Sequence, residues 1–178
     1  MRWEISKEFE FCYGHRVWSQ TLNKNFALDD CLVCRHLHGH QGKVIVHLKG
    51  DKLKDGMITD FKHLNWFKKF LDDRVDHKFI LDINDPLYET MLPLYKEKKD
   101  LIYFDENYYL PDLTKIKNEP NHIREYVESF VLVDFVPTSE NLSYWFISIV
   151  QKKMAKLGVE VSKVELYETS KSKSMALS

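Results

Sequence analysis

Residues 2 to 15 alternate between apolar side chains and charged or polar ones. Successive side chains of a strand point to opposite faces, so this alternation predicts a strand with one buried face. His15 falls on that apolar face if the alternation continues through Gly14, and a lone histidine there is usually a core residue. The apolar positions of this predicted strand are Trp3, Ile5, Phe9, Phe11 and Tyr13.

A second strand is predicted at about residues 38 to 49. His38 and His40 share one face of it, with only Gly39 between them. Two imidazoles side by side make two thirds of a three-histidine metal site, for which His15 is the candidate third ligand. Cys34, four residues before His38, could supply a thiolate nearby.

Two amphipathic helices are predicted further along the chain, each with a helix-capping residue at its start. Asp60 is placed to cap the first helix, which should end near residues 73 to 75. Thr138 or Ser139 is placed to cap the second, and Gly158 should end it.

Residues 84 to 129 differ from the rest of the chain, because they hold four of its five prolines and six of its nine tyrosines. Proline at this density interrupts long helices and central strands. The tyrosines make the segment too apolar for a disordered linker. We therefore expect an ordered excursion that packs on the main domain, without a second core of its own.

The remaining strands are predicted at residues 130 to 136 and 161 to 169. Glu168 shares a face with apolar side chains in the last strand, where an unpaired carboxylate costs free energy. It is either a functional residue or a strand-end residue near solvent. Residues 170 to 178 are polar and are expected to be frayed. The order of elements predicts an α+β fold, an antiparallel sheet with two helices on one face.

The composition excludes several classes of protein. A hydrophobic content of 44% with 30% charged residues is typical of a soluble globular domain, and 178 residues suit a single one. A net charge of -1 argues against a surface for nucleic acid, although a local basic pocket is compatible with it. The sequence contains neither a membrane-length apolar run nor a signal peptide. Three cysteines suit a reducing compartment, so the expected location is the cytoplasm.

Six short motifs occur in an order that resembles one family, the 6-pyruvoyltetrahydropterin synthases, and within it the bacterial 6-carboxy-5,6,7,8-tetrahydropterin synthase branch of queuosine biosynthesis. The Cys-x-x-x-His-Gly-His signature is the most specific of them. The motifs are Phe11-Cys-Tyr-Gly-His15-Arg16, Cys34-Arg-His-Leu-His38-Gly-His40, Gly56-Met-Ile-Thr-Asp60-Phe61, Asp76-His77, Pro137-Thr-Ser-Glu-Asn141 and Tyr167-Glu168-Thr169.

The resemblance implies a role for each matching residue. His15, His38 and His40 would bind a catalytic Zn²⁺, with an open position for substrate. Cys34 would be the catalytic thiol, with Asp76 and His77 as its proton-transfer partners. The pterin ring would be anchored by Glu168 and held further by Thr138.

The resemblance also implies a reaction and an assembly. A zinc-dependent lyase would convert 7,8-dihydroneopterin triphosphate to 6-carboxy-5,6,7,8-tetrahydropterin, with release of acetaldehyde and triphosphate. The fold would be a single tunnelling-fold domain over residues 1 to 178, with an ordered insertion at about 84 to 129. The sheets of three subunits would join into a barrel, and two trimers would stack as a homo-hexamer.

Several alternatives remain open from the sequence. The pyruvoyl-forming branch shares the site but makes a different product. A non-catalytic module could bind a structural zinc through Cys31, Cys34, His38 and His40, and Cys31 with Cys34 could instead be a redox pair. The folate-precursor branch carries a glutamate at the position of Cys34, which argues against it. Arg16 and Lys43 are candidate contacts for the triphosphate.

Overall fold

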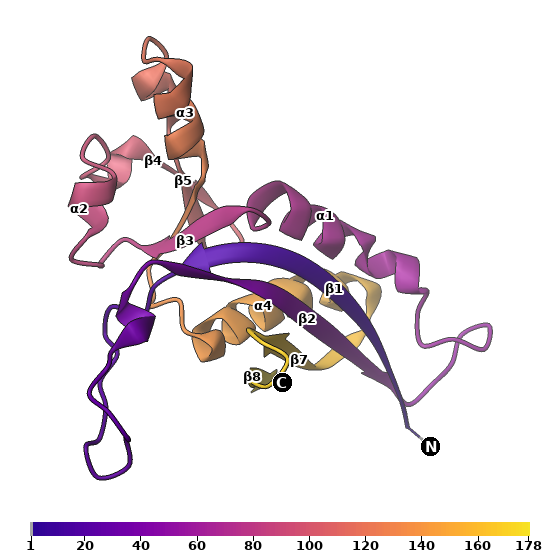
Figure 1. The fold of residues 1–178 in the computed structure, drawn as a ribbon. Helices are drawn as coiled ribbons and strands as arrows, with labels where there is room; N and C mark the ends of the chain where they lie inside the picture. The colour runs from indigo at the N-terminus through magenta and orange to yellow at the C-terminus, as the bar shows by residue number, and fades with distance from the viewer. Residues whose placement is uncertain (1) are drawn as a thin grey trace. The chain divides into compact units, whose positions relative to one another are not determined.

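A computed structural model describes residues 2 to 178, and its elements are shown in Figure 1. Eight strands form one sheet in the order β4-β5-β6-β3-β1-β2-β7-β8. The strands are β1 (Trp3–His15), β2 (His38–Gly50), β3 (Lys78–Asp82), β4 (Leu101–Phe104), β5 (Tyr108–Pro111), β6 (Phe130–Val133), β7 (Glu160–Tyr167) and β8 (Lys173–Leu177). The α-helices are α1 (Asn65–Arg74), α2 (Tyr88–Met91), α3 (Asn121–Glu128) and α4 (Ser139–Met154).

Five short 3₁₀ turns complete the list of elements. They are η1 (Val33–Arg35), η2 (Phe61–Leu64), η3 (Lys98–Asp100), η4 (Leu113–Ile116) and η5 (Ala155–Leu157). Two of the expected helix signals are confirmed here. The carboxylate of Asp60 accepts the backbone N–H of Lys62 at 2.7 Å, and η2 then runs into α1. Gly158 takes the left-handed conformation that follows η5, with a φ of 67°.

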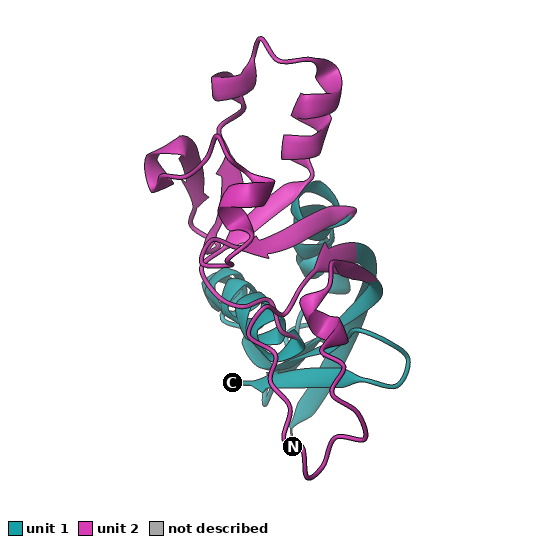
Figure 2. Cartoon of the chain, turned by 60° about the vertical axis from the view of Figure 1, so that its left-hand side comes forward, with its two compact units in different colours: residues 1–12, 40–76, 139–178 teal, residues 13–39, 77–138 magenta. Residues whose placement is uncertain are grey.

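The chain divides into two compact units, coloured separately in Figure 2. Unit 1 comprises residues 1–12, 40–76 and 139–178, and unit 2 comprises residues 13–39 and 77–138. The boundary falls within β1 and β2, so both long strands belong partly to each unit.

Unit 1 buries one face of β1, β2 and β7 under α1 and α4. Phe9 and Phe11 of β1 meet Phe67 of α1 and Phe146 of α4 edge to face, with ring centroids 5.5 and 5.9 Å apart. The rings of Phe67 and Phe146 in turn lie 5.8 Å apart. Edge-to-face aromatic contacts of this kind add stability beyond the area that they bury. The apolar positions of the alternating segment, residues 2 to 15, therefore lie on the side of β1 that packs against the helices.

Unit 2 contains the proline-rich excursion, which forms α2, β4, β5 and α3. A buried apolar cluster combines excursion residues with residues of β3 and β6. Hydroxyl groups of the tyrosines bond within the same segment, as Tyr88 donates to the carbonyl of Tyr95 at 2.6 Å. The cluster consists of Leu81, Tyr88, Leu92, Tyr95, Ile116, Val127, Phe130 and Leu132.

The sheet is mixed, so the prediction of an antiparallel sheet was wrong. β3 pairs in parallel with β1 on one side and with β6 on the other. Parallel neighbours require a long crossover connection, and residues 83–129 supply the one between β3 and β6. The sequence did not identify β3 because its apolar run, residues 79 to 81, is only three residues long and begins a few residues after a helix.

The expectation of a frayed tail was also wrong. Residues Lys173 to Leu177 form β8, which pairs with β7 in antiparallel register from Lys163↔Leu177 to Tyr167↔Lys173. The tail looks polar because only one side of this edge strand is covered. Ser174 on the covered side donates its hydroxyl to the carbonyl of Ser139 at 2.6 Å.

The sheet face of unit 1 opposite the helices carries a buried carboxylate that the sequence did not single out. Glu165 of β7 is only 6% exposed and accepts a hydrogen bond from the ammonium of Lys173 on β8 at 2.5 Å. The nearest imidazole nitrogen of His47 lies 2.8 Å from its other oxygen. Burial alone would raise the pKa of Glu165, but Lys173 and then His47 outweigh it and lower the pKa.

Replacing Lys173 by methionine is therefore expected to lower the free energy of unfolding at pH 7, because the buried Glu165 carboxylate loses its ammonium partner. Because the pKa of Glu165 is lowered by folding, its stabilising contribution is complete above the ordinary Glu pKa of about 4.3. That contribution is lost as the pH falls through the lowered value. Urea unfolding should thus separate the variant from the parent at pH 7, and the difference should shrink as the pH falls below about 4.3, while Lys171→Met should differ little at any pH.

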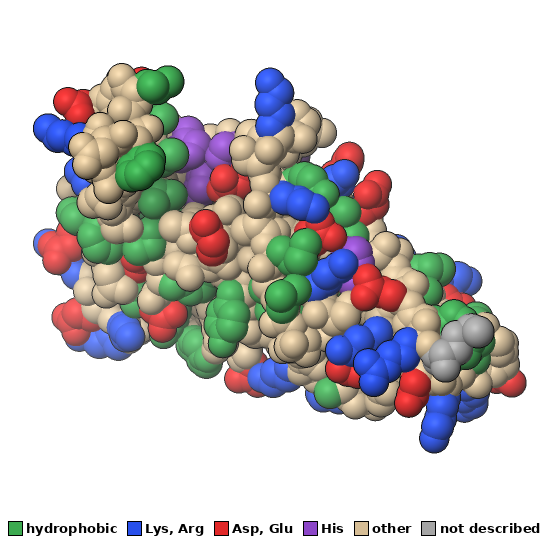
Figure 3. Space-filling model, turned by 90° about the horizontal axis from the view of Figure 1, so that it is seen from below, with side chains coloured by type: hydrophobic (Ala, Val, Ile, Leu, Met, Phe, Trp, Pro, Cys, Tyr) green, Lys and Arg blue, Asp and Glu red, His purple; other side chains and the backbone are tan. Residues whose placement is uncertain are grey.

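The face shown in Figure 3 mixes acidic and basic side chains, and histidine side chains gather in one place on it. No helix within residues 2 to 178 is long and apolar enough to cross a lipid bilayer.

Candidate active site

Three histidines from the adjoining ends of β1 and β2 form a group that could hold a metal ion. His15 is the last residue of β1, and His38 and His40 begin β2. One ligand nitrogen from each lies within 4.8 Å of the others. The two strands are neighbours in the sheet, so side chains on the same face at their ends meet. The predicted three-histidine cluster is therefore present in the structure.

Backbone carbonyls fix the tautomers of two of these imidazoles. Nδ1 of His15 lies 2.6 Å from the carbonyl oxygen of Pro137, and Nδ1 of His38 lies 2.8 Å from that of His36. A carbonyl can only accept, so Nδ1 of each ring is the donor, and in the neutral imidazole Nε2 then carries the lone pair. Metal-binding histidines are commonly held in this way. The neutral tautomers thus suit a metal.

The two ligand-bearing strands approach closely at Gly39. A Cβ added there would lie 2.9 Å from the carbonyl oxygen of Tyr13, nearer than real Cβ contacts allow. The rings of His15 and His38 already lie 4.5 Å apart between centroids, so little room remains for adjustment. Glycine between the two β2 histidines is therefore a requirement of the site.

Gly39→Ala is accordingly expected to destabilise the metal-free protein by about 1–3 kcal/mol, because the strands must separate to admit the methyl group. The same separation should weaken binding of a metal at the three histidines, for which zinc is the probe. Thermal unfolding and a zinc titration would measure the two effects. Gln41→Ala, at an exposed position two residues further along β2, is the control and should change neither. Unchanged zinc affinity in Gly39→Ala would contradict the argument.

Cys34 lies in η1, just before β2, and is half-buried. Its N–H donates to the side-chain oxygen of Gln20 at 3.0 Å, and its carbonyl accepts the N–H of Val17 at 2.7 Å. Within residues 2 to 178, neither Cys34 nor Cys31 belongs to the group that could hold a metal. Both are free thiols, with Cys31 exposed. This arrangement disfavours a structural zinc site of two cysteines and two histidines.

Asp76 and His77 connect α1 to β3. The carboxylate of Asp76 accepts the N–H of Cys12 at 2.7 Å, which ties the pair to β1 three residues before His15. His77 is exposed and has a left-handed backbone, with a φ of 58°. Non-glycine residues rarely adopt this conformation, and where it occurs it often marks a functional position.

Glu168 and Thr138 lie in two connecting segments. Glu168 follows β7, is half-buried, and donates its N–H to the carbonyl of Ser172 in the turn toward β8. Thr138 is half-buried and follows Pro137, the residue whose carbonyl holds His15. The segment before α4 therefore carries both a support for the metal site and a predicted substrate contact.

Comparison with known proteins gives one consistent result. The family model of 6-pyruvoyl tetrahydropterin synthase matches residues 4–176. A 6-carboxy-5,6,7,8-tetrahydropterin synthase from Aquifex aeolicus is 32% identical over 97% of this chain and 96% of its own. The chain belongs to the 6-pyruvoyl tetrahydropterin synthase family. It is thus an enzyme of this family, as the motifs predicted.

Solved structures agree with this membership. The crystal structure of an uncharacterised protein from Wolinella succinogenes is 54% identical, with a TM-score of 0.97 over 99% of this chain and 98% of that one. A 6-pyruvoyltetrahydropterin synthase from Plasmodium vivax shares the fold at 18% identity, with a TM-score of 0.55 over 99% of this chain and 97% of its own. The expected tunnelling fold of this family is therefore confirmed.

The two candidate triphosphate contacts lie in different surroundings. Arg16 follows His15 and pairs with the buried carboxylate of Asp85 at 3.2 Å. Lys43 is an odd-numbered residue of β2 and so faces away from His38 and His40. Its ammonium lies 3.7 Å from Glu8 and over the ring of Tyr167. Lys43 is thus unsuited to contact a substrate at the metal of its own chain.

Several supporting groups of this family member were missed by sequence reasoning. Pro137 and His36 act through backbone oxygens, which carry no residue-specific signal. Asp82 and Asp85 are buried and hold Trp18 and Arg16. Their signal was two acidic residues directly after the apolar run at residues 79 to 81, in a segment that was not identified as a strand.

Proposed function

We propose that this protein is a zinc-dependent 6-carboxy-5,6,7,8-tetrahydropterin synthase of queuosine biosynthesis. It would convert 7,8-dihydroneopterin triphosphate and water to the carboxytetrahydropterin, acetaldehyde and triphosphate. The single observation that carries the proposal is the cluster of His15, His38 and His40, with its tautomers set by carbonyls, in a chain of this family. The similar Aquifex protein bears the name of this activity.

The donor set fits zinc. Neutral imidazole nitrogens suit this borderline metal, and three protein ligands are typical of catalytic zinc sites that keep a position for substrate. Bound there, Zn²⁺ would supply Lewis acidity to the hydroxyl groups of the substrate side chain. His15 would be the most rigid of the ligands, because it is only 1% exposed and bonded to Pro137.

The protein's own residues would bind the pterin and move protons. Cys34 would remove a proton from a carbon of the substrate side chain, because a thiolate is an effective base near neutral pH when a cation is close. His77, oriented by Asp76, would carry a proton to or from the other side. Glu168 would accept hydrogen bonds from the ring N–H and amino groups of the pterin, and Thr138 would help to hold the same ring. Binding of the pterin would account for the half-buried carboxylate of Glu168 in the turn after β7.

We propose that the domain assembles through the outer edges of β1 and β8. β8 is the last strand in the sheet order, and β3 pairs with β1 only at Tyr13 and Gly14. Residues 3–12 of β1 and all of β8 therefore present edges that β1–β8 pairing between copies would cover. Contacts between two different edges close into rings. A ring of three, stacked in pairs, would give a hexamer.

The domain would be one tunnelling-fold unit with the segment 84–129 as an insertion, working in the cytoplasm. Three free cysteines are consistent with a reducing compartment.

Light scattering on the purified protein would test the proposed hexamer, since six chains of 21.3 kDa give about 128 kDa. A monomeric, fully active protein would reject it.

The deciding experiment incubates the zinc-loaded protein with 7,8-dihydroneopterin triphosphate. Mass spectrometry would identify the pterin, and a coupled assay would measure acetaldehyde. Carboxytetrahydropterin with an equivalent of acetaldehyde is expected. The alternative product is pyruvoyltetrahydropterin without acetaldehyde. It would place the protein in the sister branch, to which the 6-pyruvoyltetrahydropterin synthase of Plasmodium vivax belongs by its name. No turnover by a zinc-loaded protein would reject both.

A further inference from the structure

The turn that carries Cys34 is not held by its own packing. η1 contains no buried residue, and Val33 and Leu37 on either side of Cys34 are more than half exposed, at 56% and 57%. A three-residue 3₁₀ turn has little stability by itself. Its position must therefore be fixed by contacts with other parts of the chain.

Those contacts come from the segment that follows β1. Val17 donates its N–H to the carbonyl of Cys34 at 2.7 Å, and Gln20 accepts the N–H of Cys34. The guanidinium of Arg35 donates twice to the carbonyl of Gln20, at 2.9 and 2.6 Å. Both backbone groups of Cys34 are thus bonded to residues 17 and 20.

Two side chains that flank Val17 anchor this segment in turn. Trp18 donates its indole N–H to the carboxylate of Asp82 at 2.9 Å, and Arg16 pairs with Asp85 at 3.2 Å. The two carboxylates are nearly inaccessible, at 2% and 4% exposure. The Trp18–Asp82 contact is a directional hydrogen bond, whereas Arg16 and Asp85 form a buried ion pair without hydrogen-bond geometry.

The carboxylates are themselves rigid, because they shape the turn between β3 and α2. Asp82 accepts the backbone and side-chain N–H groups of Asn84 at 2.9 and 3.0 Å, and Asp85 accepts the N–H of Leu87 at 2.8 Å. The N–H of Asp85 donates to the carbonyl of Asp82 at 3.0 Å. The contacts of Trp18 with Asp82 and of Arg16 with Asp85, called the anchor below, thus involve the start of the proline-rich excursion.

We propose that Arg16 and Trp18 are positioning residues for the Cys34 thiol, acting through Val17 from the buried carboxylates of Asp85 and Asp82. This inference rests on the proposed role of Cys34 in the reaction. It also gives the first turn of the excursion a task, since that turn sets where the thiol lies. His15, next in sequence to Arg16, is held separately through Pro137.

The test uses two variants of the zinc-loaded protein that leave the turn at Asp82 and Asp85 intact. Trp18→Phe removes the indole donor, and Arg16→Gln removes the positive charge of the ion pair. Each is expected to lower kcat about tenfold, equivalent to about 1.4 kcal/mol, with KM within about twofold and zinc content unchanged. Arg16→Lys keeps the charge pair and should restore most of the loss. Tyr126→Phe removes one hydrogen bond, to the Met91 carbonyl, elsewhere in the excursion and should have no effect.

A second measurement does not depend on turnover. In a Cys31→Ser background, iodoacetamide labelling of Cys34 is followed by peptide mass spectrometry, with the exposed Cys12 as internal reference. Release of the half-buried thiol should raise its labelling rate relative to Cys12 at least about threefold in both variants. If the parent protein proves inactive, this rate alone decides the proposal.

Three results would overturn it. Loss of zinc in both variants would mean that the anchor holds His15 rather than Cys34. A rise in KM without a fall in kcat would make Arg16 a substrate contact. Unchanged kcat and unchanged labelling would mean that η1 is held without the anchor.

Discussion

Cys34→Ala is expected to lower turnover at least about a hundredfold while the protein stays folded and loaded with zinc. A positioned acid or base contributes about two to four orders of magnitude to rate, and alanine offers no group that can replace the thiol. Zinc should remain, because Cys34 is outside the three-histidine group. The fold should remain, because the side chain is only half-buried. Steady-state kinetics, metal analysis and thermal unfolding of one preparation would check all three.

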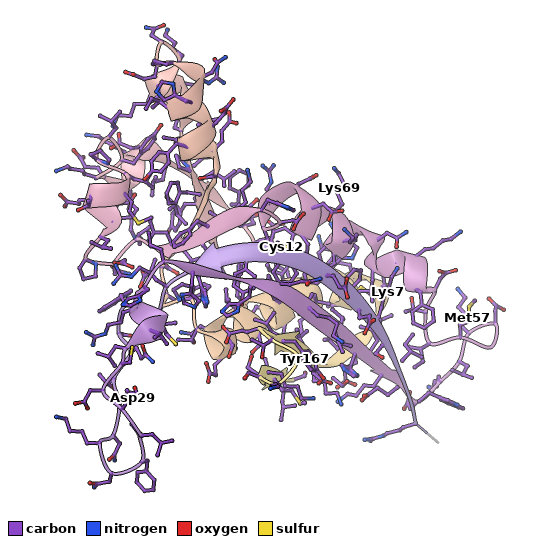
Figure 4. The ribbon with its side chains drawn as sticks, in the orientation of Figure 1. Lys7, Cys12, Asp29, Met57, Lys69 and Tyr167 are labelled. Atoms are coloured by element: carbon purple, nitrogen blue, oxygen red, sulfur yellow. The ribbon has the colours of Figure 1, made fainter. Side chains whose placement is uncertain are left out.

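The chain provides two matched controls for this variant. Cys12 and Cys31 are both exposed, and Figure 4 labels Cys12 on β1. Cys12→Ala should leave turnover unchanged, and Cys31→Ala, three residues before Cys34, should leave most of it. If Cys34→Ala instead unfolds or loses its zinc, the cysteine has a structural role and the catalytic assignment fails.

Removal of the metal is expected to have an effect of similar size. Chelation should abolish turnover, and added Zn²⁺ should restore it, because backbone carbonyls hold the imidazoles of His15 and His38 independently of the metal. In His38→Ala the chelator-stripped protein should not recover at the same zinc concentration. Loss of one of three ligands removes far more than the ten- to hundredfold in affinity that supporting groups contribute. A zinc titration followed by activity would show the difference.

His122→Ala is the control for His38→Ala. His122 lies in α3 and is not part of the three-histidine group, so its zinc affinity and turnover should match those of the parent. Full activity of metal-free protein would contradict the proposed function. Full recovery of His38→Ala would show that His38 is not a ligand.

The sequence predicted the elements whose signal is local. Alternation identified β1 and β2, and Asp60 and Gly158 marked helix boundaries that the structure confirms. β3 and β8 were missed because each is five residues long and depends on its neighbours. β3 is stabilised by parallel partners far away in sequence, and β8 by pairing along β7. Such non-local pairing leaves no periodic pattern in a single sequence.

The residues of the candidate site also divide into those that local spacing predicts and those that depend on contacts between distant parts of the chain. Spacing was sufficient to group His38 with His40, since strand geometry fixes their common face. The link from Trp18 to Asp82 joins residues that are 64 positions apart, and no local pattern reports it. The partner of the buried Glu165 carboxylate, Lys173, lies on a strand that was not predicted. The segment around Asp29, which Figure 4 labels, forms neither helix nor strand.

The left-handed backbone of His77 has a consequence for the evolution of the protein. A non-glycine residue in this conformation is less stable than glycine by about 1 kcal/mol, so His77→Gly should make the fold more stable. A search that selects for thermal stability alone would therefore favour loss of this imidazole. Its persistence would need selection on turnover, and His77 would be a position where stability and activity oppose each other.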